Sequence, residues 1–342
     1  MNIDKNYVLD LAKEILEIPS PSGYTKEVIR RIKKEADAFS LKYETTKKGN
    51  VIIDVEGSGE KTVGLAVHVD TLGAMVRSIT DKGDLRFTSI GGPTWPTLDG
   101  EYCTIITRDG RHYTGTFLSD ATAIHVHKEA KDKKRSPETM YVRIDERVHS
   151  KDDVLALGIE VGDYIVFDPK TTITESGFVK SRFLDDKINV ASVFGLLKAL
   201  REKGRTPGAN LKLIISTYEE VGHGAAFIPE LDELIAVDMG CIGEDLSCTE
   251  EDVSICAKDS SGPYDYDLVS AFKSLAKKNG INHAVDIYPM YGSDVSAARR
   301  GGNDFKGALI GPGVHASHGM ERTHYEAIKA TIELLYAYVN AE

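Results

Sequence analysis

The sequence predicts a doubly wound α/β fold with a mixed central sheet and an inserted small all-β, barrel-like domain. The α/β part is indicated by apolar, strand-like runs that alternate with segments of helical spacing, both before residue 71 and from residue 175 onward. The insert is indicated by residues 72–174, where short β-like runs are separated by turn signals such as Asp109-Gly110. The predicted α/β domain is therefore discontinuous, consisting of residues 1–71 and 175–342.

Two helices and two strands are predicted before the insert. Residues 3–17 place apolar side chains at helical spacing, and Ile18-Pro19-Ser20-Pro21 ends that helix because proline lacks a backbone donor. A second amphipathic helix is predicted over residues 25–38. Residues 51–55 and 62–69 have the apolar, β-branched character of strands.

The alternation of helices and strands returns after the insert. The segment that follows Asp185 is rich in valine and leucine and predicts a helix. The remaining expected elements are strands at 211–217, 234–238 and 253–257, a helix at 266–278, strands near Val285 and Ala308, and a helix at 325–339. Ligands of such sheets bind at the carboxyl ends of the strands, so polar residues there are the first candidates for a site.

The composition excludes several classes of protein. The net charge of −11 opposes binding to nucleic acid, which needs basic patches. No run approaches the ~20 apolar residues that span a bilayer, and Met1–Lys5 lacks the basic start of a signal peptide. The four cysteines show no C-x-x-C spacing and fit a reducing cytoplasm. We therefore expect a cytoplasmic protein that binds neither nucleic acid nor a membrane.

Five short motifs contain histidines and carboxylates that could form one site. They are His68-Val69-Asp70, Asp185-Asp186, Glu219-Glu220, Asp238 and His318. Each ends or follows an apolar run, or lies in a glycine-rich turn. Two imidazoles and three carboxylates can hold two divalent ions side by side, and a spare glutamate can then act as a base. The motifs therefore predict metal-assisted hydrolysis.

His68 and Asp70 face the same side of their predicted strand, because side chains alternate along a strand. A metal-bound imidazole usually needs an acceptor on its other nitrogen, so we interpret His68 as a ligand and Asp70 as its orienting partner. Taken singly, the motifs also have structural explanations: capping groups at 185–186, a solvated acidic turn at 219–220, and a turn former at Asp238. Five such motifs at plausible strand ends argue against coincidence.

The order and context of these motifs resemble the TET (tetrahedral) aminopeptidases, a family of dinuclear metallopeptidases also known as glutamyl or deblocking aminopeptidases and as endoglucanase M. The resemblance covers nearly the whole chain, from Pro19-Ser20-Pro21-Ser22-Gly23 to the His318 turn. It implies a zinc-peptidase-like (phosphorylase/hydrolase-like) α/β domain. It also implies two divalent ions per subunit, zinc or cobalt or alternatively manganese. The ligands that it implies are His68, Asp185, Glu220, Asp238 and His318.

The resemblance also implies individual roles at the two acidic pairs. In the family the first aspartate of an L-D-D motif bridges the metals, which indicates Asp185, and Asp186 then positions the loop. Glu219 corresponds to the general base and Glu220 to a metal ligand. Like charges side by side at a strand end are costly unless cations offset them, and two metals remove that difficulty.

The last two ligands rest on spacing and context. Asp238 lies at the family's spacing after Glu220, where the terminal carboxylate ligand is expected. The family's last ligand is a histidine at the start of a turn, and the S-H-G-x-E-R-T context favours His318 over His315.

The chain departs from the family pattern at two places. Lys187 replaces the arginine that is expected after the aspartate pair. The turn after Glu220 is one residue shorter than the commoner E-E-V-G-x-x-G-A form, and His223 in this turn is a rival ligand. Asp294 and the loop at 259–263 resemble recurring family loops near the site, which suggests a substrate role, with turn formation as the alternative.

The expected function is that of a metallo-aminopeptidase acting on small peptides, with a metal-bridged water as the nucleophile and Glu219 as the general base. In the resembling family the β insert dimerises the chains, and the dimers assemble into a hollow dodecamer that admits only small peptides. We therefore expect a homo-oligomer in which residues 72–174 drive self-association.

Three alternatives remain from the sequence. A metal-dependent deacylase or carboxypeptidase-type amidohydrolase would use the same metals on N-acyl amino acids, but such relatives usually carry their insert after the helical part that follows the bridging aspartate. Here the insert directly follows His68-Val69-Asp70. An endoglucanase would need two carboxylates flanking a sugar bond and no metal cluster. A catalytically inactive peptidase fold that serves as an oligomeric scaffold would not need all the metal ligands, whereas the predicted ligands are all present in this chain.

Overall fold

The computed structural model describes residues 3–341, which form two compact units. The α/β unit consists of the segment up to Asp70 and the segment from Lys170 onward, and the barrel unit consists of Thr71–Pro169. The predicted fold class, an α/β sheet domain with an inserted barrel, is confirmed.

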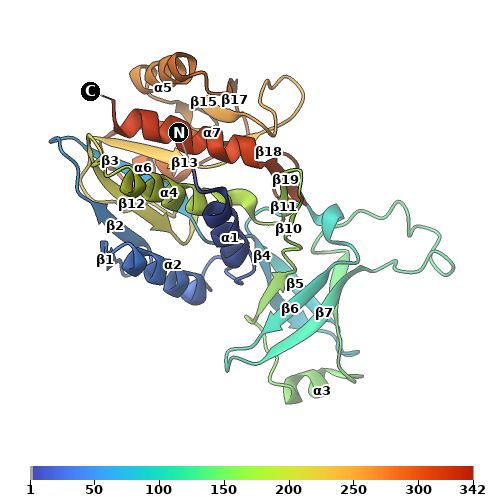
Figure 1. The fold of residues 1–342 in the computed structure, drawn as a ribbon. Helices are drawn as coiled ribbons and strands as arrows, with labels where there is room; N and C mark the ends of the chain where they lie inside the picture. Colours follow the sequence, from blue (N-terminus) through green and yellow to red (C-terminus); the bar gives the residue numbers. More distant parts are fainter. Residues whose placement is uncertain (1–2, 342) are drawn as a thin grey trace. The chain divides into compact units, whose positions relative to one another are not determined.

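A mixed ten-stranded sheet forms the centre of the α/β unit (Figure 1). Its order is β1-β2-β12-β3-β13-β18-β15-β16, with β14 beside β18 and β17 beside β15. The strands are β1 Lys42–Thr45, β2 Val51–Val55, β3 Thr62–His68, β12 Asn210–Ser216, β13 Glu233–Val237, β14 Gly240–Cys241, β15 Val253–Asp259, β16 Gly262–Pro263, β17 His283–Ile287 and β18 Lys306–Val314. The four central strands β12, β3, β13 and β18 are parallel, so their carboxyl ends share one edge.

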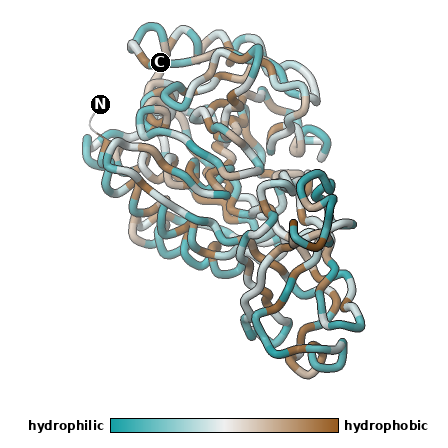
Figure 2. The backbone as a smooth tube through the Cα atoms, turned by 90° about the vertical axis from the view of Figure 1, so that its right-hand side faces the viewer, coloured by the Kyte–Doolittle hydropathy of each residue, from teal (hydrophilic) through white to brown (hydrophobic). Residues whose placement is uncertain are grey.

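Helices cover the sheet and complete its core. They are α1 Lys5–Leu16, α2 Lys26–Ala38, α4 Leu184–Glu202, α5 Tyr266–Asn279, α6 Asp294–Arg300 and α7 Tyr325–Val339. Helix α4 packs closely on α1 and α7. A Cβ added to Gly195 of α4 would lie 2.7 Å from Val8 of α1 and 3.1 Å from Ile332 of α7. Figure 2 shows hydrophobic stretches of the chain in the interior and hydrophilic ones along the outer turns.

A small three-stranded sheet brings two distant segments of the α/β unit together. It consists of β10 Thr172–Ile173, β11 Phe178–Ser181 and β19 Glu321–His324, in that order. Our sequence analysis extended the insert to residue 174, but residues 172–173 pair with β11 in the α/β unit. The two-residue strand is too short to show any periodicity of its own, so the sequence could not place this boundary.

The barrel unit is a closed six-stranded antiparallel barrel with the order β4-β5-β8-β7-β6-β9. The strands are β4 Gly73–Ile79, β5 Leu85–Ile90, β6 Tyr102–Ile106, β7 His112–Ser119, β8 Met140–Ile144 and β9 Tyr164–Phe167, with a short helix α3 at Lys151–Ala156. Phe117 lies at the centre of its core, with ring centroids 5.0 Å from Phe87 and 5.4 Å from Phe167. This unit therefore has a hydrophobic core of its own.

The predicted helices and strands of the α/β unit are present, with ends within a few residues of the expected ones. Helix α6 was not predicted, because the sequence analysis treated Asp294 as part of a loop. The helix is only seven residues long and begins with a capping box formed by Ser293 and Ser296, so it is too short for a periodic signal. Among the described residues, none of the helices combines the length and apolar character that a membrane-spanning helix needs.

Candidate metal centre

The carboxyl ends of three neighbouring parallel strands place four of the predicted site residues together. His68 is the last residue of β3 and is paired with Ser216, the last residue of β12. Glu219 and Glu220 begin a single 3-10 turn that follows β12. Asp238 directly follows β13, the strand on the other side of β3. These residues meet because the strands are parallel.

Asp185 and His318 reach the same edge through the small three-stranded sheet. Ser181 of β11 pairs with Glu321 of β19, so the start of α4 lies beside the turn that contains His318. The buried Glu321 carboxylate accepts hydrogen bonds from the backbone N–H groups of Asp185 and His318, both at 3.0 Å. His318 has a φ of 62°, in the left-handed region. One carboxylate therefore fixes both loops.

The Asp185 carboxylate lies between two imidazoles. Its Oδ1 is 3.0 Å from His68 Nε2, and its Oδ2 is 3.6 Å from His318 Nε2. Glu220 Oε2 lies 3.7 Å from His318 Nε2. The His68 side chain is 2% exposed and the His318 side chain is 36% exposed. Of the two imidazoles, His318 is therefore the one open to solvent.

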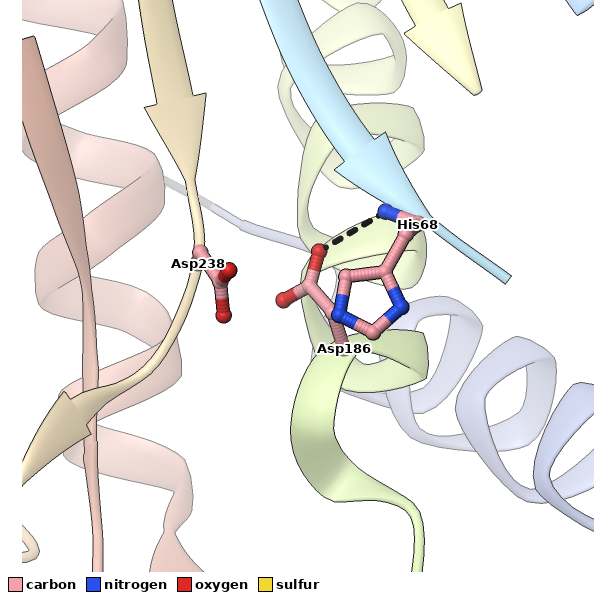
Figure 3. Close-up of side chains that lie close together, drawn as sticks. All are labelled: His68, Asp186 and Asp238. Atoms are coloured by element: carbon pink, nitrogen blue, oxygen red, sulfur yellow. Dashed lines mark hydrogen bonds between the residues drawn. The ribbon is translucent and has the colours of Figure 1, made fainter. Parts of the chain in front are cut away.

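Two groups of side chains in the described part of the chain could each hold a cation. In one, ligand atoms of His68, Asp185 and Glu220 lie within 4.8 Å of one another; in the other, those of His68, Asp186 and Asp238 do. Figure 3 shows Asp238, just past β13, pointing toward His68 and Asp186. The Asp186 oxygens already accept bonds from His68 N at 3.0 Å and from Asn189 Nδ2 at 2.7 Å. These bonds tie Asp186 to the end of β3 and to α4.

Asp70 contacts the His68 ring through its backbone carbonyl group. His68 Nδ1 lies 3.0 Å from the Asp70 carbonyl oxygen but 3.6 Å from its carboxylate, so the carbonyl is the hydrogen-bond partner of the ring. The buried carboxylate accepts from Ser22 Oγ at 2.5 Å and from the N–H groups of Glu219 and Glu220 at 3.1 and 3.3 Å. When His68 Nδ1 donates to the Asp70 carbonyl, Nε2 is the ring nitrogen left to bind a metal ion, on the side of Asp185. Asp70 thus orients the ring through its backbone and the acidic turn through its side chain.

Glu219 lies close to these groups without belonging to either. Its Oε2 is 3.7 Å from His68 Nε2, and its side chain is 15% exposed, against 4% for Glu220. The ligand groups found among the described residues contain Glu220 but not Glu219. The ring of the rival ligand His223 stacks on Tyr218 with centroids 5.0 Å apart, and His223 is in neither ligand group of the described residues.

The protein environment raises the pKa of several of these carboxyl groups. Burial, followed by the charge of Asp185, raises the pKa of Glu220 to about 8 and that of Asp238 to about 7. Burial also raises the pKa of Glu219 well above its ordinary value. Burial acts against ionisation of Asp185 as well, but hydrogen bonds with His318 and His68 hold its pKa below the ordinary value. Carboxylates crowded in this way are stabilised when cations lie between them, so the donor set fits divalent metal ions.

Comparison with known proteins identifies the family. Residues 49–334 match the family model described as M42 glutamyl aminopeptidase. The chain is 44% identical to the putative aminopeptidase YhfE of Bacillus subtilis, over 97% of each chain. The chain belongs to the M42 peptidase family. It is also 29% identical to the lysyl aminopeptidase of Pyrococcus furiosus, over 62% of this chain and 60% of that one.

A solved structure with the same fold is the TET1 peptidase of Pyrococcus horikoshii. It is 25% identical to this chain, with a TM-score of 0.84 to 0.85 over at least 98% of each chain. The resemblance to the TET aminopeptidases that the motifs indicated is therefore confirmed. The chain is a peptide hydrolase, and both its family and its His, Asp and Glu cluster favour divalent metal binding.

Several residues that shape the site of this M42 peptidase were not predicted. Glu321 lies within the motif that selected His318, but its role depends on the distant pairing of β11 with β19. Ser22 lies in the quoted proline-rich segment, and its bond to Asp70 becomes visible only in three dimensions. The buried Lys187 donates to the Ile18 carbonyl oxygen at 2.7 Å, and burial lowers its pKa to about 7.

Proposed function

We propose that this M42 peptidase is a dinuclear metal-dependent aminopeptidase that removes N-terminal residues from small peptides. The observation that carries the proposal is the position of Asp185, whose two oxygens face two different imidazoles. A carboxylate placed between two imidazoles would be shared by two divalent ions.

Each ion would have its own set of ligands around the shared carboxylate. As the family resemblance implies, His68, Asp185 and Asp238 would hold one ion, and Asp185, Glu220 and His318 the other; Glu220 and His318 lie 3.7 Å apart. Nitrogen and carboxylate oxygen donors without thiolate suit zinc or cobalt, and also manganese. When bound, such ions polarise the scissile carbonyl and lower the pKa of water.

Glu219 is the residue that would move protons. Its raised pKa suits a general base that accepts a proton from the attacking water and passes it to the leaving amine. Asp70 holds the backbone of the Glu219–Glu220 pair, and through its carbonyl the ring of His68, so it would act as a positioning residue.

The test of this function is a comparison of substrates with free and blocked amino groups. Aminoacyl-anilides carrying different side chains, including lysyl and glutamyl, are assayed after restoring zinc, cobalt or manganese separately. We expect cleavage of the free amines and only background cleavage of their N-acetylated counterparts. Hydrolysis of N-acyl amino acids in place of the free amines would instead identify the deacylase or carboxypeptidase type of amidohydrolase.

We also propose that the chains self-associate through the barrel unit, as dimers that assemble into a dodecamer. The P. horikoshii TET1 peptidase can assemble into a tetrahedron or a large octahedral shell. In this chain the barrel unit carries large apolar side chains that face solvent. They include Tyr102 at 66%, Val126 at 77% and Val161 at 66% exposure. We propose that these exposed side chains belong to the surface that another copy covers.

Light scattering tests this assembly. The intact chain should have the mass of several subunits, whereas a chain with residues 72–169 replaced by a short Gly/Ser linker should be smaller. Val126→Ser should weaken the assembly. Tyr266→Ser is the matched control, because Tyr266 is an equally exposed apolar residue of the α/β unit at 83%. A monomeric intact chain, or an assembly that survives the deletion unchanged, would contradict the proposed role.

A further inference from the structure

The loop that carries Glu219 and Glu220 is fixed at its base by two buried side chains. This loop leaves the sheet after Ser216 and returns at Ala225, and the only regular structure in it is the 3-10 turn Glu219–Val221. The turn ends at Gly222 in the left-handed conformation, with a φ of 84°. A loop of this kind does not by itself hold a side chain in one position, so the contacts at its base matter.

Asp294 joins the two ends of this loop. Its Oδ2 accepts a hydrogen bond from Ser216 Oγ at 2.6 Å, and its Oδ1 accepts one from Ala225 N at 2.8 Å. The residue is 3% exposed and begins α6. Since both oxygens are used within the protein, the geometry does not favour the substrate contact that the sequence suggested for Asp294.

Asn50 joins the next pair of residues from a different element. Its Oδ1 accepts from Thr217 Oγ1 at 2.9 Å, and its Nδ2 donates to the Gly224 carbonyl oxygen at 2.9 Å. The residue is 2% exposed and directly precedes β2. Asp294 therefore links residues 216 and 225, and Asn50 links residues 217 and 224.

The close approach of Asp294 to the loop requires glycine at position 224. A Cβ added to Gly224 would lie 2.5 Å from Asp294 Oδ1, 2.8 Å from Ser216 Oγ and 2.9 Å from Glu219 N. A larger residue at position 224 would displace both the Asp294 carboxylate and the backbone of Glu219. The position of Glu219 is thus coupled physically to the two links at the base of the loop.

We infer that Asp294 and Asn50 are positioning residues that hold Glu219 in place for proton transfer. The inference rests on the proposed role of Glu219 as the general base. Displacing a catalytic group by about 1 Å can cost ~10²-fold in rate without loss of substrate binding. Removing either link should therefore lower kcat and leave KM nearly constant.

The experiment compares kcat, KM and metal content in a series of variants. Asp294→Ala and Asn50→Ala should each lower kcat by ~10- to 10²-fold with KM changed less than about twofold. Gly224→Ala should also lower kcat, although it removes no hydrogen-bonding group. Asp294→Asn should recover most of the turnover, because the amide can accept from Ala225 N and donate to Ser216 Oγ.

Asp286→Ala is the matched control for the loss of a buried aspartate. Asp286 is 8% exposed and accepts hydrogen bonds from Ser247 N, Ser247 Oγ and Cys248 N, each at 2.9 Å, in the same unit. This change should lower the free energy of unfolding and leave kcat unchanged. Equal losses of kcat in Asp286→Ala and Asp294→Ala would show a merely structural effect and overturn the inference.

Other outcomes would overturn the inference in other ways. A raised KM with constant kcat in Asp294→Ala would make Asp294 a substrate-binding residue. A loss in Asp294→Asn as large as in Asp294→Ala would mean that the charge matters and the links do not. Glu219→Gln is measured alongside: if it retains normal turnover, the assignment of the base fails. If it loses turnover while Asp294→Ala and Asn50→Ala do not, only the present inference fails.

Discussion

Glu219→Gln is expected to leave the fold and the bound metal intact while lowering kcat by ~10²–10⁴-fold, the usual contribution of a general base. The amide has the same shape as the carboxyl group but cannot accept a proton. The backbone N–H of residue 219 would still donate to Asp70, since that bond does not involve the side chain. Steady-state kinetics, metal analysis and thermal unfolding of the same sample measure the three quantities.

Glu220→Gln is the natural comparison, because the two glutamates are adjacent in one turn. Glu220 lies 3.7 Å from His318 Nε2 and belongs to a ligand group, so its amide variant should retain less metal. Added metal should then restore part of its activity but none of the activity of Glu219→Gln. The opposite pattern, with metal loss in Glu219→Gln and a slow but metal-loaded Glu220→Gln, would reverse the two assignments.

Removal of metal is expected to abolish activity. We expect about two divalent ions per chain in the active protein, because Asp185 faces two imidazoles and the remaining carboxylates divide between them. A chelator should reduce turnover to background, and zinc, cobalt or manganese should restore it to different extents. His318→Ala should lower the metal content toward about one ion per chain, because it removes a ligand from one of the two proposed sets.

Metal removal should also lower the thermal stability. A ligand that binds only the folded state stabilises it by about 2.7 kcal/mol when its free concentration is 100 times Kd. The crowded carboxylates strengthen this expectation, since without cations they repel one another. An active protein that contains no transition metal, and whose activity survives the chelator, would contradict the dinuclear proposal.

The sequence predicted the residues at strand ends better than the contacts between loops. His68, Glu219, Glu220 and Asp238 follow apolar runs, and parallel strands necessarily bring such residues to one edge. The convergence of Asp185 and His318 depends instead on the pairing of Ser181 with Glu321. That pairing joins residues far apart in the chain and leaves no local pattern, so the resemblance to a family was needed to include His318.

Individual hydrogen-bond partners could not be predicted from the sequence for a related reason. Alternation along a strand placed Asp70 on the same side as His68, but it could not show whether the carbonyl or the carboxylate contacts the ring. The links made by Asn50 and Asp294 could not be predicted either, because an asparagine before a strand and an aspartate at the start of a short helix are common in structural turns. Such contacts are decided by tertiary packing.

The interrupted α/β unit has a consequence for how the chain folds as it is synthesised. Strand β3 precedes the barrel unit, but both of its neighbours in the sheet, β12 and β13, follow it. Until those strands leave the ribosome, β3 has two unpaired edges and an apolar sequence, a state prone to aggregation. The barrel unit, whose strands pair only with one another, can bury its core first. Among the proposed ligands His318 comes last along the chain, after β18, so the full ligand set could assemble only once every strand of the ten-stranded sheet has been made.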